Sequence, residues 1–293
     1  MALITPFDDF PIHQTAETLA VPSSSDRNHY DRYWFNGFSE EKDFLFEIGV
    51  GFYPNRHIMD AHFSISTAGK QYSYHASARM NPARYPINIG PISLEILEPM
   101  QKVRFSLKDP EKKLSCDLIF NAITEPHLEP KSLMIEGTRK ILETSRFTQF
   151  GKWDGSIETE SGNLDLTKEY GTRDKSWGVR PVGEPEIGAP GKLNAEPGVY
   201  WCWIPINFGD TFTHFGTFED HDGNSTQLSA DLVEISNNEI IKPLNNISHK
   251  VDWIKGTRWS SGAQISAQEG DKKIEINAKA CGPRFHCKGI GYQ

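Results

Sequence analysis

Short runs of alternating apolar and polar residues, separated by turn residues, most restrict what this chain can fold into. The runs KDFLFEIGVGFYP, IMDAHFSIST and QYSYHASARM lie within residues 42–80, and SLEILEP, KVRFSLKD and LSCDLIFNAI follow over 93–123. A period of two with Pro, Gly and Asp-Pro turns between runs is typical of antiparallel strands. The best helix candidate, residues 129–150, is weakened by Gly137 and β-branched residues. The sequence therefore predicts an all-β fold with few short helices.

The second half of the chain repeats the order of strand-like runs and turns of the first half, at an offset of about 150 residues. GVYWCWIPINFGDTFTHFGTFEDHDGN, at 198–224, is similar to residues 43–70: each has an aromatic strand, a turn and a strand containing a histidine. Residues 254–283 likewise echo residues 97–126. We interpret the pattern as a duplicated β-unit that forms two tandem lipocalin-like antiparallel barrel or sandwich domains.

The expected domain organisation follows from this duplication. Residues 1–30, irregular and interrupted by prolines, form an N-terminal arm that lies on another part of the molecule. Residues 31–165 form the first lipocalin-like domain and residues 166–293 the second. The final FHCKGIGYQ is typical of the beginning of a strand, which predicts a truncated last barrel that lacks its closing strand.

Composition excludes several classes of protein. The 293 residues are 37% hydrophobic and 24% charged, and the net charge of −8 without a Lys/Arg run argues against a nucleic-acid partner. The first residues, MALITPFDDFPIHQ, lack a secretion signal, and no apolar run is long enough to span a bilayer, so we expect a cytoplasmic protein. Four cysteines without a CxxC pair predict buried free thiols. The oligomeric state is left open.

The stretch EYGTRDKSWGVRP, residues 169–181, concentrates charge near the expected junction of the two domains. If it is extended, Tyr170, Thr172 and Asp174 share one face of the strand. Arg173 and Lys175 then share the opposite face.

Two interpretations of Asp174 follow from this placement. Burial against Trp177 would raise the pKa of Asp174 and make it a general acid, whereas Arg173 or Arg180 nearby would keep it ionised. The structural alternative is an Arg–Asp pair that only fixes a loop between the barrels.

Aromatic residues of the second half form a second candidate feature. In YWCWIP, Trp201 and Trp203 fall on one strand face and can line an apolar wall or stabilise a developing carbocation by cation–π attraction. Simple core packing is the alternative. Tyr53 and Phe218 are added as candidate substrate contacts.

Histidines and acidic residues complete the candidate set. Asp60 and His62 share one strand face and His57 lies on the other, which spoils a metal site, so none is expected. His62 and His214 occupy matching places in the two halves and are expected to face the barrel lumens as acid or base groups. Phosphate-binding and nucleophile-elbow motifs are missing from the sequence, and no cofactor is expected.

FYPNRHIMDAHFSI and YGTRDKSWGVRP together resemble the hydroxyneurosporene-synthase-like (AttH-type) tandem lipocalin-like family, which includes carotenoid 1,2-hydratases. The resemblance covers residues 30–290, and its most specific part is G-x-R-D-x-S-W-G-x-R at 171–180. It implies two lipocalin-like domains around an apolar cavity and an Asp that protonates an alkene without a cofactor. Related proteins act as cyclases, Diels–Alderases or isomerases in natural-product pathways. This chain departs from the hydratases at HFGTFEDHD, where Phe218 and Asp220 replace a tyrosine–aspartate pair.

These observations predict a cofactor-independent hydratase or lyase, isomerase or cyclase that acts on a lipophilic, isoprenoid or polyketide-like substrate. The first candidate for the catalytic acid is Asp174, and Asp60, His62 and His214 are second-rank proton-transfer groups. The candidate substrate-binding residues are Arg173, Trp177, Arg180, Tyr53, Trp201, Trp203 and Phe218. The main competing hypothesis is a non-catalytic carrier of an apolar molecule, which needs a lumen but no buried ionisable group. An esterase-like or metal-dependent hydrolase is a third possibility.

Overall fold

The computed structural model describes residues 6–11, 18, 20–111, 113–181, 200–235 and 240–286. The chain divides into two compact units between Leu193 and Asn194, and it returns to the first unit at Pro283. This division lies later than the expected boundary at 165/166, because the strand β12 (Gly162–Val179) pairs with strands of the first unit.

In the part of the first unit that the structure describes, the chain forms twelve strands and two short 3-10 turns. The turns are η1 (Pro6–Asp9) and η2 (Pro54–Arg56). The strands before β12 are β1 (His29–Ser39), β2 (Phe44–Tyr53), β3 (Ile58–Thr67), β4 (Lys70–Arg79), β5 (Ile87–Ile89), β6 (Ile92–Glu98), β7 (Lys102–Lys108), β8 (Leu114–Ala122), β9 (His127–Leu128), β10 (Ser132–Glu136) and β11 (Arg139–Thr159). No helix in the described residues has the length and apolar character needed to cross a membrane.

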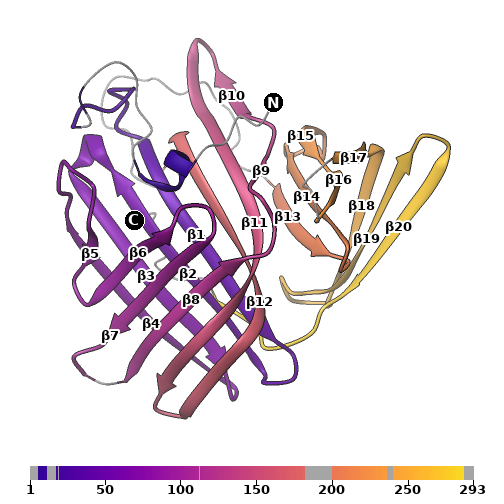
Figure 1. Ribbon diagram of the computed structural model, residues 1–293. Coiled ribbons are helices and arrows are strands. Elements are labelled where there is room, and N and C mark those ends of the chain that lie inside the picture. The colour runs from indigo at the N-terminus through magenta and orange to yellow at the C-terminus, as the bar shows by residue number, and fades with distance from the viewer. Residues whose placement is uncertain are drawn as a thin grey trace. The chain divides into compact units, whose positions relative to one another are not determined.

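All twelve strands belong to one antiparallel sheet that curves into a nearly closed barrel (Figure 1). The strand order is β4-β3-β2-β1-β12-β11-β8-β7-β6-β5, and β9 and β10 also pair with β11. The two ends of this order approach each other, since β5 contacts β3 and β4. This arrangement confirms the all-β, lipocalin-like prediction. Residues 129–150, considered as a helix, instead form β10 and β11, which turn at Gly137 with φ of +59°.

Aromatic side chains fill the barrel interior. The rings of Phe46 and Phe120 meet Trp153 edge to face at centroid distances of 5.3 and 5.2 Å, and all three residues are fully buried. Such pairs contribute about 0.5–1.5 kcal/mol each beyond the area they bury. Gly171 of the signature makes room for this cluster, because a Cβ there would clash with Trp153 Nε1. The Trp153 indole donates a hydrogen bond to the Asn36 carbonyl (2.8 Å).

The described residues of the second unit form two smaller antiparallel sheets. Its strands are β13 (Tyr200–Asn207), β14 (Thr211–Glu219), β15 (Ser225–Ser229), β16 (Asp231–Glu234), β17 (Ile240–Pro243), β18 (Asn245–Trp253), β19 (Ser260–Glu269) and β20 (Lys272–Lys279). β13 to β17 form one sheet and β18 to β20 the other. The two repeats seen in the sequence correspond to hairpins, since β13–β14 matches β2–β3 and β19–β20 matches β7–β8.

Three cysteines lie in the described residues, and they are free thiols in three environments. Cys116 is buried in the barrel, Cys202 is half-buried and Cys281 is exposed. Among these three, the prediction of a buried thiol is confirmed for Cys116 only. Cys287 and the final residues, on which the expectation of truncation rests, lie outside the described residues.

Candidate functional site

The two faces of β12 carry different charge arrangements. As the alternation predicted, Arg173 and Lys175 share one face of the strand and Asp174 lies on the other. The face that holds Arg173 and Lys175 points into the barrel. There the register places Lys175 opposite Tyr33 and Arg173 opposite Phe35, two residues of the core.

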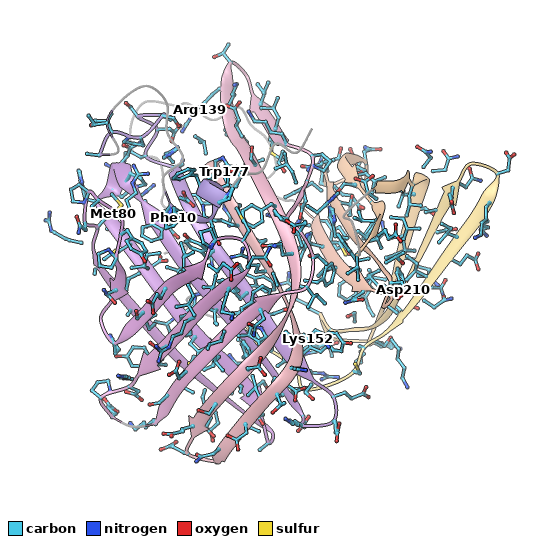
Figure 2. The ribbon with its side chains drawn as sticks, in the orientation of Figure 1. Phe10, Met80, Arg139, Lys152, Trp177 and Asp210 are labelled. Carbon is cyan, nitrogen blue, oxygen red and sulfur yellow. The ribbon has the colours of Figure 1, made fainter. Side chains whose placement is uncertain are left out.

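Inside the barrel, each cation has a close carboxylate partner. Arg173 Nη1 lies 2.9 Å from Asp9 Oδ1, and Lys175 Nζ lies 2.7 Å from Asp31 Oδ1, with all four side chains buried. Asp9 belongs to η1, at the barrel end where Figure 2 shows Trp177. Burial lowers the pKa of Lys175 and Asp31 opposes this effect. Arg173 thus fixes the N-terminal arm rather than contacting Asp174.

Trp177 faces the same way as these pairs. Lys175 Nζ lies 5.3 Å from the centroid of its ring, and Phe147 meets the ring edge to face at 6.4 Å. Asp174 and Trp177 are three residues apart in an extended strand, so their side chains point to opposite faces of the sheet. The predicted contact between them is therefore not formed.

The outer face of the barrel wall brings together most of the other candidates from the first unit. Directly paired residues form a row across six strands: Ser77, Asp60, Gly51, Arg32, Ser176 and Arg146. The next row is His75, His62, Gly49, Trp34, Asp174 and Thr148. Because paired residues project to the same side of a sheet, these side chains form one polar surface, here called the outer polar cluster. Glu47, Tyr53, Glu129, Tyr30 and Arg180 border it.

Asp60 and Tyr53 form a hydrogen-bonded pair in this cluster. Burial raises the pKa of Asp60 to about 6, while Arg32 and the hydrogen bond from Tyr53 act to lower it. Burial, followed by the charge of Asp60, raises the pKa of Tyr53 well above its usual value. Gly51 is the floor beneath the pair, since a Cβ there would lie 2.6 Å from Tyr53 Oη and 2.8 Å from Asp60 Oδ1.

Several arginines surround the Asp174 carboxyl group. Arg146 Nε lies 3.8 Å from Asp174 Oδ1, and Arg146 Nη1 lies 3.5 Å from Glu129 Oε2. Burial raises the pKa of Asp174, whereas Arg146, Arg32 and Arg180 act to lower it. The pKa of Arg146 is raised, because Glu129 and Asp174 together outweigh the effect of burial.

His62 lies on the outer face and not in the lumen, because its neighbour Phe63 occupies the interior. Its Nε2 is 3.6 Å from Glu47 Oε1, and the other oxygen of Glu47 accepts a hydrogen bond from Trp34 Nε1 (3.4 Å). The rings of His62 and His75 stack at 5.9 Å. Burial lowers the pKa of His62, which favours the neutral imidazole.

The candidates of the second unit gather on one face of the β13–β14 hairpin. The Trp201 ring stacks on Trp203 at 6.4 Å and on Phe218 at 6.0 Å, and Trp201 is 47% exposed. His214 shares this face through its pairing with Pro205 and is fully buried. The hairpin thus presents an aromatic ladder, defined here as Trp201, Trp203 and Phe218.

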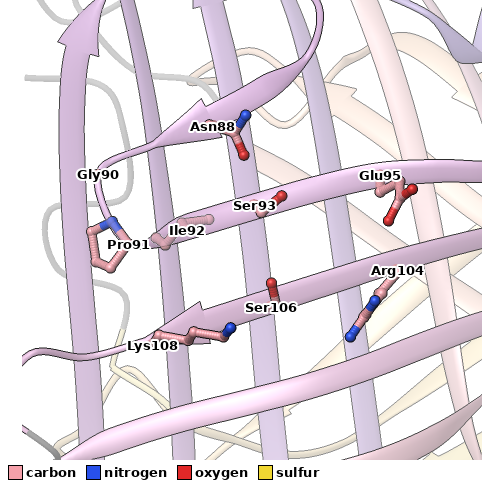
Figure 3. Close-up of a pocket in the computed structure, with 9 residues that line it drawn as sticks. All are labelled: Asn88, Gly90, Pro91, Ile92, Ser93, Glu95, Arg104, Ser106 and Lys108. Carbon is pink, nitrogen blue, oxygen red and sulfur yellow. The ribbon is translucent and has the colours of Figure 1, made fainter.

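A shallow hollow of about 320 Å³ lies elsewhere on the barrel, over β5, β6 and β7 (Figure 3). It is lined by polar side chains, among them Glu95, Arg104 and Lys108. Arg104 is held by Asp117 through two hydrogen bonds of 2.7 and 2.6 Å. This hollow shares no residue with the outer polar cluster or the aromatic ladder.

Sequence reasoning missed Arg32, Glu47, Glu129 and Arg146. The charged pair Asp31-Arg32 between two tyrosines in HYDRYWFNG, and two glycines at period two in FEIGVGFY, are the local signals that point to Arg32 and to the floor of the cluster. Within the described residues, no group of three or more His, Cys, Asp or Glu is arranged to hold a metal ion.

The fold and the outer polar cluster define a lipocalin-like β-protein with ionisable groups buried on one outer wall. The chain belongs to a family of unknown function, DUF8625, whose model matches residues 4–293. No curated protein matches it.

Solved structures of similar fold include a putative AttH from Nitrosomonas europaea, with 15% identity, a TM-score of 0.54, and coverage of 81% of this chain and 77% of that one. Kievitone hydratase from Nectria haematococca has 12% identity and a TM-score of 0.53, covering 88% and 82%. CghA has 10% identity and a TM-score of 0.52, covering 92% and 82%. These likenesses show the shared fold.

Proposed function

We propose that this chain is a cofactor-independent enzyme that transfers protons to or from a lipophilic, isoprenoid or polyketide-like substrate. The observation that carries the proposal is the Asp60–Tyr53 pair. A carboxyl group with a pKa of about 6 exchanges its proton readily near neutral pH, which is the property a general acid or base needs. Asp60 is also half-buried rather than fully buried.

The chemistry begins with the protonated form of Asp60. Its proton passes to one carbon of an alkene, and the neighbouring carbon becomes a cation. In hydration, water adds to that cation and returns a proton to the Asp60 carboxylate. In isomerisation the adjacent C–H bond supplies the returned proton, and in cyclisation a second alkene of the substrate attacks the cation first.

The other candidates take supporting roles in this proposal. Burial raises the pKa of Asp174 although the arginines around it oppose this shift, so we keep Asp174 as a second candidate acid beside Asp60. The second unit, taken by itself, presents the aromatic ladder as an apolar surface whose ring faces attract a cation. His62 and His214 are second-rank proton-transfer groups, since both are almost completely buried.

A carrier that holds its ligand inside the barrel is the competing function. The ring cluster around Trp153 occupies that interior, and the ionisable groups of the outer polar cluster serve no purpose in a passive carrier. Both observations favour the enzyme.

The test starts from the lipophile that organic solvent extracts from purified protein. That compound, together with a panel of isoprenoid and polyketide alkenes, is incubated with fresh protein in ²H₂O and followed by mass spectrometry. We expect deuterium incorporation or the gain of one water. Asp60→Asn should lose roughly 100-fold or more of the rate. Compounds that all return unchanged, or full turnover by a folded Asp60→Asn variant, would contradict the proposal.

A further inference from the structure

The barrel holds the carboxylate of Asp9, the last residue of η1, at one of its ends (Figure 1). Asp9 is fully buried, and its Oδ1 accepts a hydrogen bond from Arg173 Nη1 (2.9 Å). Its Oδ2 accepts one from the backbone N–H of Met100 (2.7 Å) and a longer one from Arg173 Nη2 (3.4 Å). The Tyr33 hydroxyl donates to the Asp9 carbonyl. A guanidinium group and a backbone N–H therefore converge on one carboxylate.

The groups that hold this carboxylate are positioned by the barrel itself. Gln149 on β11 accepts two hydrogen bonds from Arg173, one from Nε (2.8 Å) and one from Nη2 (2.5 Å). The Gln149 side-chain amide in turn donates to the carbonyls of Met100 (2.9 Å) and Thr124 (2.8 Å). Arg173, Gln149 and Met100, here called the carboxylate cradle, thus belong to β12, β11 and the turn between β6 and β7, and not to the segment that fills the cradle.

Met100 adds a second sign that the cradle is built for an anion. Its φ of +62° lies in the left-handed region, which a non-glycine residue adopts at some energetic cost. The same residue points its N–H at the bound carboxylate and gives its carbonyl to Gln149. The strained turn therefore both supplies a donor to the anion and orients the residue that orients Arg173.

Aromatic rings lie beside the bound carboxylate. The guanidinium carbon of Arg173 is 5.5 Å from the centroid of the Phe147 ring. Phe10 follows Asp9, packs against the core of the barrel, and meets the ring of Tyr85 edge to face at 5.9 Å. The two adjacent residues that the barrel end holds therefore present a carboxylate and an aromatic ring together, which is the outline of a small aryl carboxylate.

The attachment of residues 6–11 is short. η1 is four residues long, and the Phe10 N–H bonds to the carbonyl of Phe7 (3.1 Å). Phe7 itself is 72% exposed. The Pro11 carbonyl accepts a hydrogen bond from Arg84 (3.1 Å). Few side chains of this segment are therefore engaged, and the buried carboxylate is the charged one among them.

The charge of Arg173 sets the condition under which this segment leaves. A buried guanidinium that loses its carboxylate is left uncompensated, which is strongly unfavourable. Departure of Asp9 into water is therefore costly, whereas its replacement by another carboxylate keeps Arg173 paired. Exchange of one carboxylate for another is the process that the cradle permits.

We propose that the carboxylate cradle is a binding site for an aryl carboxylate, and that Asp9 and Phe10 occupy it as an internal ligand that the free ligand displaces. A guanidinium fork and a backbone N–H give such a group both affinity and orientation. Binding is then coupled to release of residues 6–11 from the barrel end. The site lies on the inner face of β12, so the inference stands independently of the proton transfer proposed for the outer face.

The test uses the full chain and two probes that differ in charge. Phenylacetate carries a ring and a carboxylate, and phenylacetamide is its uncharged counterpart. Because Asp9→Ala removes the internal carboxylate, phenylacetate should raise the Tm of this variant in a saturable manner. We expect a dissociation constant roughly 10-fold or more below that of phenylacetamide. Asp8→Ala removes the neighbouring acidic residue of η1 and is the matched control, which should respond as the wild type does.

Hydrogen exchange of the wild-type chain tests the competition. Phenylacetate should bind the wild type roughly 10-fold or more weakly than it binds Asp9→Ala, since Asp9 competes for the cradle. At saturation it should speed the exchange of the Phe10 amide, because residues 6–11 then lose their place. Phenylacetamide should leave this exchange unchanged.

Two results overturn the inference. Equal stabilisation of Asp9→Ala by the two probes means that the cradle does not recognise a free carboxylate. Unchanged exchange of the Phe10 amide in wild type, at phenylacetate concentrations well above those that saturate Asp9→Ala, means that Asp9 is a structural partner of Arg173 and nothing more. If Asp9→Ala does not fold, Asp9→Asn, which keeps the shape without the charge, carries the same comparison.

Discussion

The inner and outer faces of the β1–β12–β11 wall use charge in opposite ways. Inside, Arg173 meets Asp9 and Lys175 meets Asp31, each as a close pair at 2.9 and 2.7 Å. Outside, Arg146 is shared between two carboxylates at 3.5 and 3.8 Å. Close pairs fix one geometry and hold the fold together. Shared charges leave each group able to respond to a proton or a ligand, which is what a reactive site requires.

The largest effect is expected from breaking an inner pair. Arg173→Met leaves the buried Asp9 carboxylate without its cation and should cost about 3–5 kcal/mol of unfolding free energy, measured by urea denaturation. The double variant Asp9→Leu/Arg173→Met should recover much of that loss, because neither charge is then buried. A loss below about 1 kcal/mol for Arg173→Met would end the distinction between the two faces.

The second effect concerns pH. The pKa of Asp60 is raised in the folded state, so its contribution to stability is complete below its unfolded pKa and is lost as pH rises through about 6. Relative to wild type, Asp60→Asn should therefore gain stability between pH 4 and pH 8, on the order of 2 kcal/mol.

Carboxyl ¹³C NMR measures the same titration directly. Tyr53→Phe removes a hydrogen bond that lowers the pKa of Asp60, so the midpoint in that variant should move upward. A midpoint near 4 in wild type would show that Asp60 is an ordinary surface carboxylate.

A third prediction probes the floor of the outer polar cluster. Gly51→Ala places a methyl group 2.6 Å from Tyr53 Oη, which should cost about 1–3 kcal/mol and change the Asp60 titration. Gly216→Ala is the matched control, because a Cβ there would come no closer than 3.3 Å to its nearest neighbour. If both variants leave the Asp60 midpoint unchanged, Gly51 does not position the pair.

Asp174→Asn compares the stability lost on the outer face with that lost on the inner face in Arg173→Met. Arg146 keeps Glu129 as a partner, so the expected loss of stability is about 1 kcal/mol, well below that of Arg173→Met. Thermal denaturation of both variants in the same buffer makes the comparison. Equal losses would mean that Asp174 is a structural ion-pair partner and nothing more.

The smallest effect should come from the exposed Arg104–Asp117 pair. Its shortest N···O distance, 2.6 Å, is even shorter than those of the inner pairs, yet water and salt screen it. Arg104→Gln should change stability by roughly 0.5 kcal/mol or less. A larger loss would show that distance, and not burial, decides which pairs hold this fold together.

Local pattern was enough to predict the strands and the two faces of β12. Period-two alternation is a property of neighbouring residues, so the sequence alone assigns Arg173 and Asp174 to opposite faces. Alternation does not say which face is interior. The sequence therefore predicts His62 in the lumen, whereas its neighbours Ala61 and Phe63 occupy that side of the strand.

The partners of the candidate residues could not be predicted in the same way. Asp9 reaches Arg173 across 164 residues, and Arg146 reaches Asp174 only because β11 and β12 lie side by side in a particular register. Such contacts depend on barrel closure, which no short window of sequence contains. The signature at 171–180 indicates the strand that carries several candidate residues. It does not identify Arg32, because Arg32 reaches this strand only through the pairing of β1 with β12.

The long-range partnership of Asp9 and Arg173 has a consequence for the synthesis of the chain. Asp9 and Arg173 are 164 positions apart, and a ribosome that adds roughly 5–20 residues per second needs roughly 10–30 s to cover that distance. During that interval β1 also lacks its neighbour β12, so one edge of the nascent sheet stays exposed. The N-terminal segment is made first and fixed late, so this sheet edge stays open to wrong strand pairing until β12 emerges.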